Sequence, residues 1–227
     1  MKLPDAGACK VVLFDLDGTL VDTAPDMAQA INRVLQNYDR PPLPYETIRP
    51  HVSAGSRGLT ELAFPVSEDR PDQQQLQQAF LDHYADHLCV ETRLFDQMTE
   101  ALEAIEQHRR WGIVTNKPGW LAVPLIKQLG LAERSACLIA GDTLSRRKPH
   151  PDPLLHACKL LHVSPAACLY LGDDERDILS ANAADMPSAV AAYGYLRQQN
   201  AVANWPTDYY IDSPTDLIDW SLSPINE

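Results

Sequence analysis

The stretch Val11-Val12-Leu13-Phe14-Asp15-Leu16-Asp17-Gly18-Thr19 decides how this 227-residue sequence folds. It begins with four apolar residues in a row, which is typical of a strand buried on both faces of a parallel sheet. After them come two carboxylates at positions i and i+2, followed by a glycine that permits a tight turn. Ligands of open α/β sheets bind beyond the carboxyl ends of the strands, so Asp15 and Asp17 are predicted to face a crevice there.

Further apolar runs continue this pattern along the chain, at residues 112–114, 137–140, 168–171, 189–192 and 209–211. Helical periodicity separates them; Met98, Leu102 and Ile105, for example, share one helix face. Strands that alternate with helices predict an α/β fold with a Rossmann-like parallel sheet.

The alternation is interrupted once, after the first strand. Between residue 20 and the run at 112 the pattern is helical, with amphipathic sets that begin at Met27 and at Leu76. An insert of this size predicts a separate helical cap domain over residues 21–88. The α/β core then comprises residues 1–20 and 89–227.

Asp15 and Asp17 suit two different steps of one reaction. A carboxylate at Asp15 can attack phosphorus and leave a hydrolysable acyl phosphate. Asp17 can protonate the leaving oxygen and then deprotonate the attacking water. An aspartate-rich turn is the plain alternative, because Asp is a favoured turn residue.

Groups suited to phosphate follow later strands. At Thr115 and Asn116 a hydroxyl and a backbone N–H lie just before a predicted helix, an arrangement that suits a phosphate oxygen. Lys148 offers a compact charge that can hold a carboxylate and a transferring phosphoryl group together. A helix cap or a solvated basic turn explains each signal equally well, so they are specific only in combination.

Asp173, at the end of a later buried strand, completes a predicted Mg²⁺ site. Magnesium prefers oxygen ligands and often uses one or two carboxylates with water and substrate phosphate. Asp15, Asp173 and the backbone carbonyl of Asp17 would supply that set. Asp174 is left open as a ligand or an outer group, and Asp177 as a residue that orients the site or caps the next helix.

The ordered combination of these motifs resembles the haloacid dehalogenase superfamily, the aspartate-nucleophile phosphatases, over essentially the whole chain. The motifs are the Asp-Leu-Asp-Gly-Thr turn at 15–19, Thr115-Asn116, Lys148-Pro149 and Gly172-Asp173-Asp174 with Asp177. The resemblance implies a Rossmann-like core with a helical cap inserted after the first strand. It also implies catalysis by Asp15 and Asp17, phosphate contacts from Thr115, Asn116 and Lys148, and Mg²⁺ on Asp15, Asp17 and Asp173.

Shorter stretches narrow the resemblance. Residues 114–118 look like the phosphoglycolate phosphatase branch, and residues 127–135 and 193–195 are similar to the N-acetylmuramic acid 6-phosphate phosphatases within it. The implied substrate is a small phosphorylated organic acid or sugar. Arg57, in the cap, can pair with a carboxylate of such a substrate. A surface arginine on the short helix that begins near Gly55 is the alternative.

Other functions share parts of this pattern. A dehalogenase needs no acid/base carboxylate at the second motif position, so Asp17 argues against it, whereas a sugar-phosphate mutase stays open. Phospho-acceptor receiver domains use similar residues but normally lack a large insert after the first strand. Polar residues at every motif position disfavour a catalytically idle binding protein.

The composition of the chain bears on its binding partners and on its location in the cell. Nineteen Lys and Arg against 31 Asp and Glu give a net charge of −12, which disfavours nucleic acid and anionic lipid as partners. No apolar run of about 18 residues occurs, so no membrane span is predicted. The absence of a secretory pattern and the five scattered cysteines favour the cytoplasm. The pattern does not indicate an oligomeric state.

Overall fold

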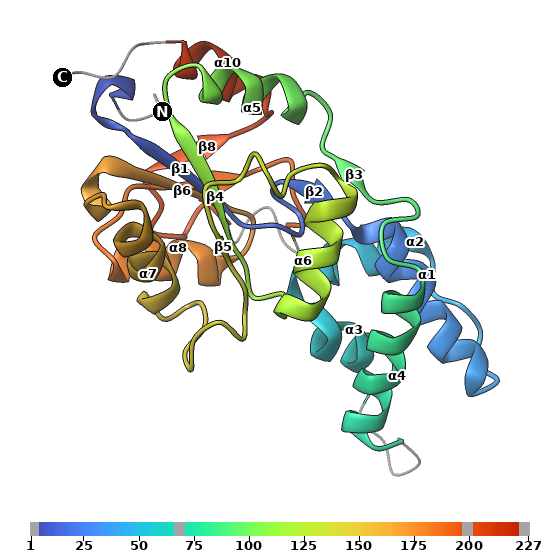
Figure 1. Cartoon of the computed structure of the whole chain (residues 1–227). Helices are drawn as coiled ribbons and strands as arrows, with labels where there is room; N and C mark the ends of the chain where they lie inside the picture. The colour runs from blue at the N-terminus through green and yellow to red at the C-terminus, as the bar shows by residue number, and fades with distance from the viewer. Residues whose placement is uncertain (1–4, 66–70, 197–201, 223–227) are drawn as a thin grey trace.

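Six strands form the central sheet of the computed structural model, which describes residues 5–65, 71–196 and 202–222 (Figure 1). Across the sheet the strands are β5 (Leu138–Ile139), β4 (Arg110–Val114), β1 (Val11–Phe14), β6 (Cys168–Gly172), β7 (Ser188–Ala191) and β8 (Tyr209–Ile211). Every neighbouring pair is parallel. The predicted α/β fold with a Rossmann-like parallel sheet is therefore confirmed, and β1 lies at its centre.

Helices cover both faces of this sheet (Figure 1). One layer holds α5 (Met98–Glu106), α6 (Gly119–Gln128) and α10 (Thr215–Ser221), and the other holds α7 (Asp152–Leu161) and α8 (Glu175–Ala183). Short 3₁₀ turns, η1 (Ala6–Ala8) and η3 (Pro165–Ala167), precede β1 and β6. Because successive side chains of a strand point to opposite faces, Val12 and Phe14 pack in the first layer and Val11 and Leu13 in the second.

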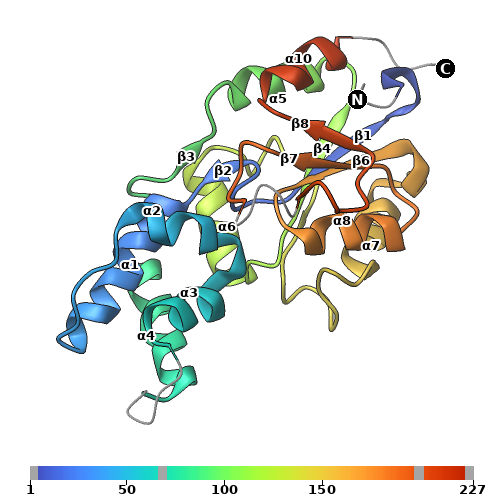
Figure 2. The same cartoon turned by 180° about the vertical axis from the view of Figure 1, so that it is seen from behind.

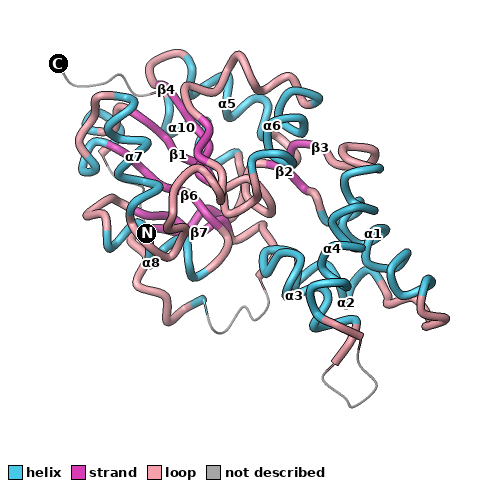
Figure 3. The backbone as a smooth tube through the Cα atoms, turned by 60° about the horizontal axis from the view of Figure 1, so that its bottom comes forward, coloured by secondary structure: helices cyan, strands magenta, loops and turns pink. Residues whose placement is uncertain are grey.

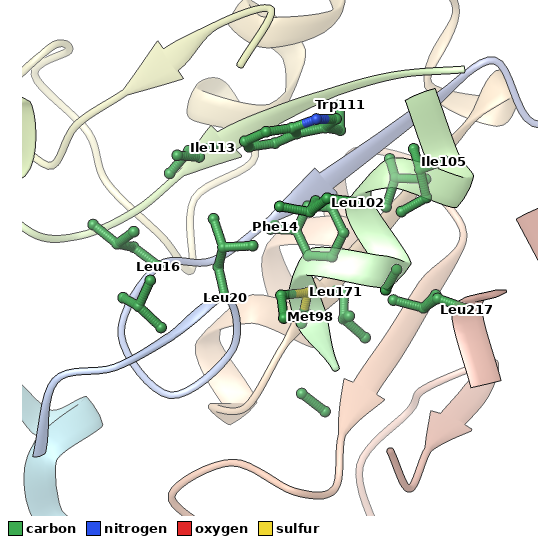
Figure 4. Close-up of a cluster of buried hydrophobic side chains, with 14 of the residues drawn as sticks. Phe14, Leu16, Leu20, Met98, Leu102, Ile105, Trp111, Ile113, Leu171 and Leu217 are labelled. Carbon is green, nitrogen blue, oxygen red and sulfur yellow. The ribbon is translucent and has the colours of Figure 1, made fainter. Parts of the chain in front are cut away.

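Phe14 shows why β1 is apolar throughout. It lies among Met98, Leu102 and Trp111 in the first layer (Figure 4). Its ring meets the Trp111 ring edge to face, with centroids 6.2 Å apart, a favourable aromatic geometry. All four residues of β1 are fully buried, which rigidly fixes the strand end that leads into Asp15.

The remaining helices gather beside the sheet as a separate group, which we call the helical module (Figures 2 and 3). It comprises α1 (Ala24–Asn37), α2 (Tyr45–Ile48), η2 (Arg49–Ala54), α3 (Gly55–Ala63) and α4 (Gln73–Asp86), which pack around an apolar cluster of their own. The chain enters through β2 (Val21–Asp22) and returns through β3 (Arg93–Leu94), which pair antiparallel. These helices fall within the predicted cap, whose limits at residues 21–88 stay a prediction. None of the helices in the described part of the chain is long and apolar enough to cross a membrane.

Asp26 ties the returning chain to the start of α1. Its carboxylate accepts hydrogen bonds from the backbone N–H groups of Val90, Glu91 and Thr92, at 3.0, 2.8 and 3.0 Å. The Thr92 hydroxyl donates a fourth bond, at 2.7 Å. Asp26 is only 2% exposed and Thr92 is fully buried, so the two Thr92 donors depend on Asp26 for their hydrogen bonds. No motif of the sequence indicated this role.

We expect Asp26→Ala to lower the free energy of unfolding by about 3 kcal/mol, because it leaves the buried N–H and hydroxyl of Thr92 without their acceptor and removes two further hydrogen bonds. Urea denaturation measures this change. Asp82→Ala, at an exposed position on α4, is the matched control and should change stability by less than about 0.5 kcal/mol. Equal effects from both substitutions would contradict the role given to Asp26.

Candidate active site

The carboxyl ends of the three central strands bring the predicted site residues together. Asp15 follows β1, Thr115 follows β4 and Asp173 is next to the end of β6. A cavity of about 390 Å³ opens beside them and is lined by residues that include Asp15, Asp17, Thr115, Asn116, Lys148 and Arg57. The crevice that the sequence predicted at this edge of the sheet is present.

Asp15 presents one engaged and one open oxygen. Its Oδ1 accepts a hydrogen bond from the backbone N–H of Leu16 at 2.7 Å and lies 2.9 Å from the Lys148 ammonium. Within the described residues no donor contacts Oδ2. A carboxylate that is fixed through one oxygen and free at the other is well arranged for nucleophilic attack.

Lys148 is buried and held on several sides. Besides Asp15 it contacts Asp177 Oδ1 at 2.6 Å, and it donates to the Tyr170 hydroxyl at 2.7 Å and to the Val114 carbonyl at 3.0 Å. Burial by itself lowers the pKa of Lys148, but the Asp15 and Asp177 carboxylates outweigh it and raise that pKa above its usual value. The ammonium is therefore charged at neutral pH.

Asp15, Asp173 and Asp177 form a buried acidic cluster, in which one carboxylate oxygen of each lies within 4.8 Å of the others. Burial, followed by the charges of Asp15 and Asp177, raises the pKa of Asp173 well above its ordinary value. Asp173 Oδ2 accepts hydrogen bonds from the Ser53 hydroxyl at 2.7 Å and from a backbone N–H at 2.9 Å. A closely spaced, all-oxygen donor set of this kind fits a hard divalent cation.

Gly18 is required where the chain turns under this cluster. Its φ is +83°, in the region that favours glycine, and a Cβ there would lie 2.2 Å from Asp173 Oδ2. Any side chain at residue 18 would displace the Asp173 carboxylate. The tight backbone approach that the sequence predicts at Gly18 is confirmed.

The side chain of Asp17 points to a different set of partners from the acidic cluster. Its Oδ1 lies 2.9 Å from the Lys117 ammonium and accepts a hydrogen bond from the Thr23 hydroxyl at 2.7 Å. Burial lowers the pKa of Lys117, and the Asp17 charge and Tyr84 hydroxyl together raise it further than burial lowers it. Lys117 is thus a buried cation beside the predicted acid/base residue.

Thr115 and Asn116 lie where the sequence placed them, immediately before α6. The Asn116 side-chain amide donates to the Lys148 carbonyl at 3.0 Å, and its Oδ1 is buried with no partner among the described residues. Its backbone N–H likewise makes no hydrogen bond within the described ranges. That N–H and the Thr115 hydroxyl are the groups available to a phosphate oxygen.

The family follows from a comparison with known proteins. The model of the haloacid dehalogenase-like hydrolases matches residues 12–191. The chain belongs to this family. The resemblance in its sequence motifs is therefore confirmed.

Similar members of this hydrolase family carry two names. N-acetylmuramic acid 6-phosphate phosphatase of Pseudomonas aeruginosa is 43% identical over 211 residues, which cover 92% of this chain and 93% of that protein. Phosphoglycolate phosphatase of Xanthomonas campestris pv. campestris is 44% identical over 209 residues, covering 92% and 94%. The crystal structure of a predicted phosphoglycolate phosphatase from Haemophilus somnus 129PT matches with a TM-score of 0.82 and 28% identity, over 93% of this chain and 97% of that one.

Asp174 and Asp177, left open by the sequence, form a reciprocal cap at the start of α8. The Asp174 carboxylate also makes an ion pair with Arg176, at 2.7 Å. Asp177 has a second role, because its Oδ1 contacts Lys148 while its Oδ2 accepts from the backbone N–H of Asp174 at 3.1 Å. Asp177 therefore caps the helix and orients the site at the same time.

Arg57 lines the cavity, but its guanidinium forms an ion pair with Glu61 on the same helix, α3. Its Nε lies 2.8 Å from Glu61 Oε1, and 77% of its side chain is exposed. Solvent screens an exposed pair of this kind, so the ion pair contributes little to stability. Arg57 can therefore leave Glu61 at little cost.

Several residues that hold the site received no role from the sequence, although Ser53 lies in a turn that the sequence predicts to face the crevice. Lys117 contacts Asp17, Tyr170 contacts Lys148, and Ser53 and Tyr195 contact Asp173. Lys117 directly follows the predicted phosphate contacts, so its position was a usable signal. The others come from distant parts of the chain and become neighbours only on folding.

The raised pKa of Asp173 predicts a pH-dependent stability. Below about pH 4 this carboxyl is protonated in both the folded and the unfolded chain, so its full contribution to the free energy of unfolding is present. That contribution is lost as the pH rises through the higher pKa of the folded state. We expect the free energy of unfolding in EDTA, taken as the difference between the unmodified protein and Asp173→Asn, to fall as the pH rises above about 4. A difference that is constant or rises with pH would contradict this expectation.

Proposed function

We propose that this hydrolase cleaves a small phosphate monoester through a phosphoryl-aspartate on Asp15. The observation that carries the proposal is the Asp15 carboxylate, which is held through Oδ1 by the Lys148 ammonium and open at Oδ2, at the edge of a cavity that also holds Asp17. Asp15 Oδ2 forms a bond to phosphorus while the bond from phosphorus to the leaving oxygen breaks. The Lys148 charge and the Thr115 hydroxyl with the Asn116 N–H stabilise the transferring phosphoryl group.

Asp17 supplies the proton transfers of both half-reactions in this proposal. It donates a proton to the leaving oxygen in the first step. In the second step it takes a proton from the water that attacks the phosphoryl-aspartate, which releases phosphate and restores Asp15. Its position beside the same cavity supports this assignment.

We propose Mg²⁺ as the cofactor, held by the carboxylates of Asp15 and Asp173 and by the backbone carbonyl of Asp17. The acidic cluster supports a hard cation there, and Asp177 is better described as the partner of Lys148. When bound, the cation neutralises the negative charge that the carboxylates and the phosphate ester share.

A substrate with a second anionic group is the proposed class. The names of the similar proteins point to phosphoglycolate and N-acetylmuramic acid 6-phosphate, which both carry a carboxylate. Arg57 lines the cavity and is held by a weak surface ion pair, which supports its proposed role as the carboxylate contact. The free state of all five cysteines supports a cytoplasmic location.

We expect phosphate release from phosphoglycolate or N-acetylmuramic acid 6-phosphate in the presence of Mg²⁺, measured colorimetrically, and its loss in EDTA. Asp15→Asn should lower kcat by at least about a thousandfold, because the nucleophile is removed. Asp82→Asn, on the exposed face of α4, should not change kcat. Unchanged turnover in Asp15→Asn, or phosphate release that requires a bisphosphate activator as in a mutase, would overturn the proposal.

We expect Arg57→Ala to raise KM for phosphoglycolate about tenfold or more, because a charged hydrogen bond to the carboxylate is lost. KM for p-nitrophenyl phosphate, which has no carboxylate, should change little. Arg33→Ala, an exposed arginine on α1, serves as the control. Equal losses on both substrates would refute a carboxylate contact.

A further inference from the structure

Lys117 is a buried cation to which the proposed reaction assigns no role. Its side chain is 4% exposed. Its ammonium lies 2.9 Å from Asp17 Oδ1 and 3.0 Å from the Tyr84 hydroxyl. It also lies 4.5 Å from the centroid of the Tyr84 ring, within cation–π distance. A buried charge is costly unless it is paired, so both contacts hold Lys117 in place.

The two donors to Asp17 occupy the same oxygen. Lys117 and the Thr23 hydroxyl both contact Oδ1, and within the described residues no donor contacts Oδ2. Charge-assisted bonds of this kind are short and strong, and two of them on one oxygen limit rotation of the carboxyl group. Oδ2 is thereby left to carry the proton that is exchanged with the leaving oxygen.

Tyr84 connects this arrangement to the helical module. It lies on α4, is 1% exposed, and its ring stacks on Phe80 with centroids 6.1 Å apart. Burial raises the pKa of Tyr84 to about 12, so the hydroxyl stays neutral and accepts a hydrogen bond from Lys117. Asp17 belongs to the turn after β1 and Lys117 to the turn after β4, so the contacts join three separate parts of the fold.

We propose that Lys117 is a positioning residue for the acid/base carboxyl of Asp17, and that Tyr84 of the helical module holds Lys117 in place. This inference rests on the proposed function, in which Asp17 protonates the leaving oxygen. In this proposal, protonation of the leaving group depends on Tyr84 of the helical module as well as on residues of the core.

Leaving-group dependence tests the inference directly. Phenyl phosphate and p-nitrophenyl phosphate have nearly the same size and no second anion, but phenolate is much the poorer leaving group and depends more on protonation. General acid catalysis typically contributes 10²–10⁴-fold. We expect Lys117→Met to lower kcat/KM at least about tenfold more on phenyl phosphate than on p-nitrophenyl phosphate, because kcat/KM reports the steps up to leaving-group release. Tyr84→Phe, which keeps the ring, should show the same bias to a smaller extent.

Lys127→Met and Tyr38→Phe are the matched controls, because both positions are exposed and distant from Asp17 in sequence. Neither should change the ratio of the two kcat/KM values. An equal loss on both aryl phosphates in Lys117→Met would overturn the inference, since direct substrate binding or a purely structural role lowers both alike. If Lys117→Met fails to fold, the bias in Tyr84→Phe decides the question. Failure of the proposed function can be told apart from failure of this inference. In that case the unmodified enzyme would release no phosphate, or Asp15→Asn would keep its full turnover.

Discussion

Lys148 carries the interaction on which the rest of the site depends. Three carboxylates with oxygens within 4.8 Å of one another would repel strongly inside a protein, and this lysine contacts Asp15 and Asp177 directly. Its neighbours keep it there, because the Tyr170 hydroxyl and the Val114 carbonyl also lie within hydrogen-bond distance of the ammonium and accept from it. Since Val114 and Tyr170 belong to the strands on either side of β1, the sheet itself aligns the ammonium with Asp15.

Side chains of the helical module form hydrogen bonds with site residues at several points. Ser53 donates to Asp173 and Tyr84 accepts from Lys117. Arg176 of α8 donates to the Ser53 carbonyl at 2.6 Å, which closes the contact from the core side. An enzyme of this design must break and remake these bonds if substrate enters between module and core, so the position of the module and the chemistry of the carboxylates are linked.

The core and the helical module contribute different residues to the cavity. In the proposed reaction the carboxylates and Lys148, all from the core, act on the phosphoryl group, which every phosphate monoester shares. Arg57 and Ser53 line the same cavity from the helical module. Identities of 43% and 44% to the two named enzymes therefore place the reaction class better than the substrate.

The sequence by itself determined the six strands of the central sheet, the helical character of the segment after β1 and the four motifs, because these depend on short-range periodicity and on residue types at strand ends. It placed Asp15, Thr115 and Asp173 at one edge of the sheet, since parallel strands direct their carboxyl ends to the same side. Only the tertiary structure decided that Asp177 pairs with Lys148, that Lys117 pairs with Asp17, and that Asp26 holds residues 90–92. Each of these contacts joins groups from separate parts of the chain whose distance depends on packing, and no local pattern encodes that distance.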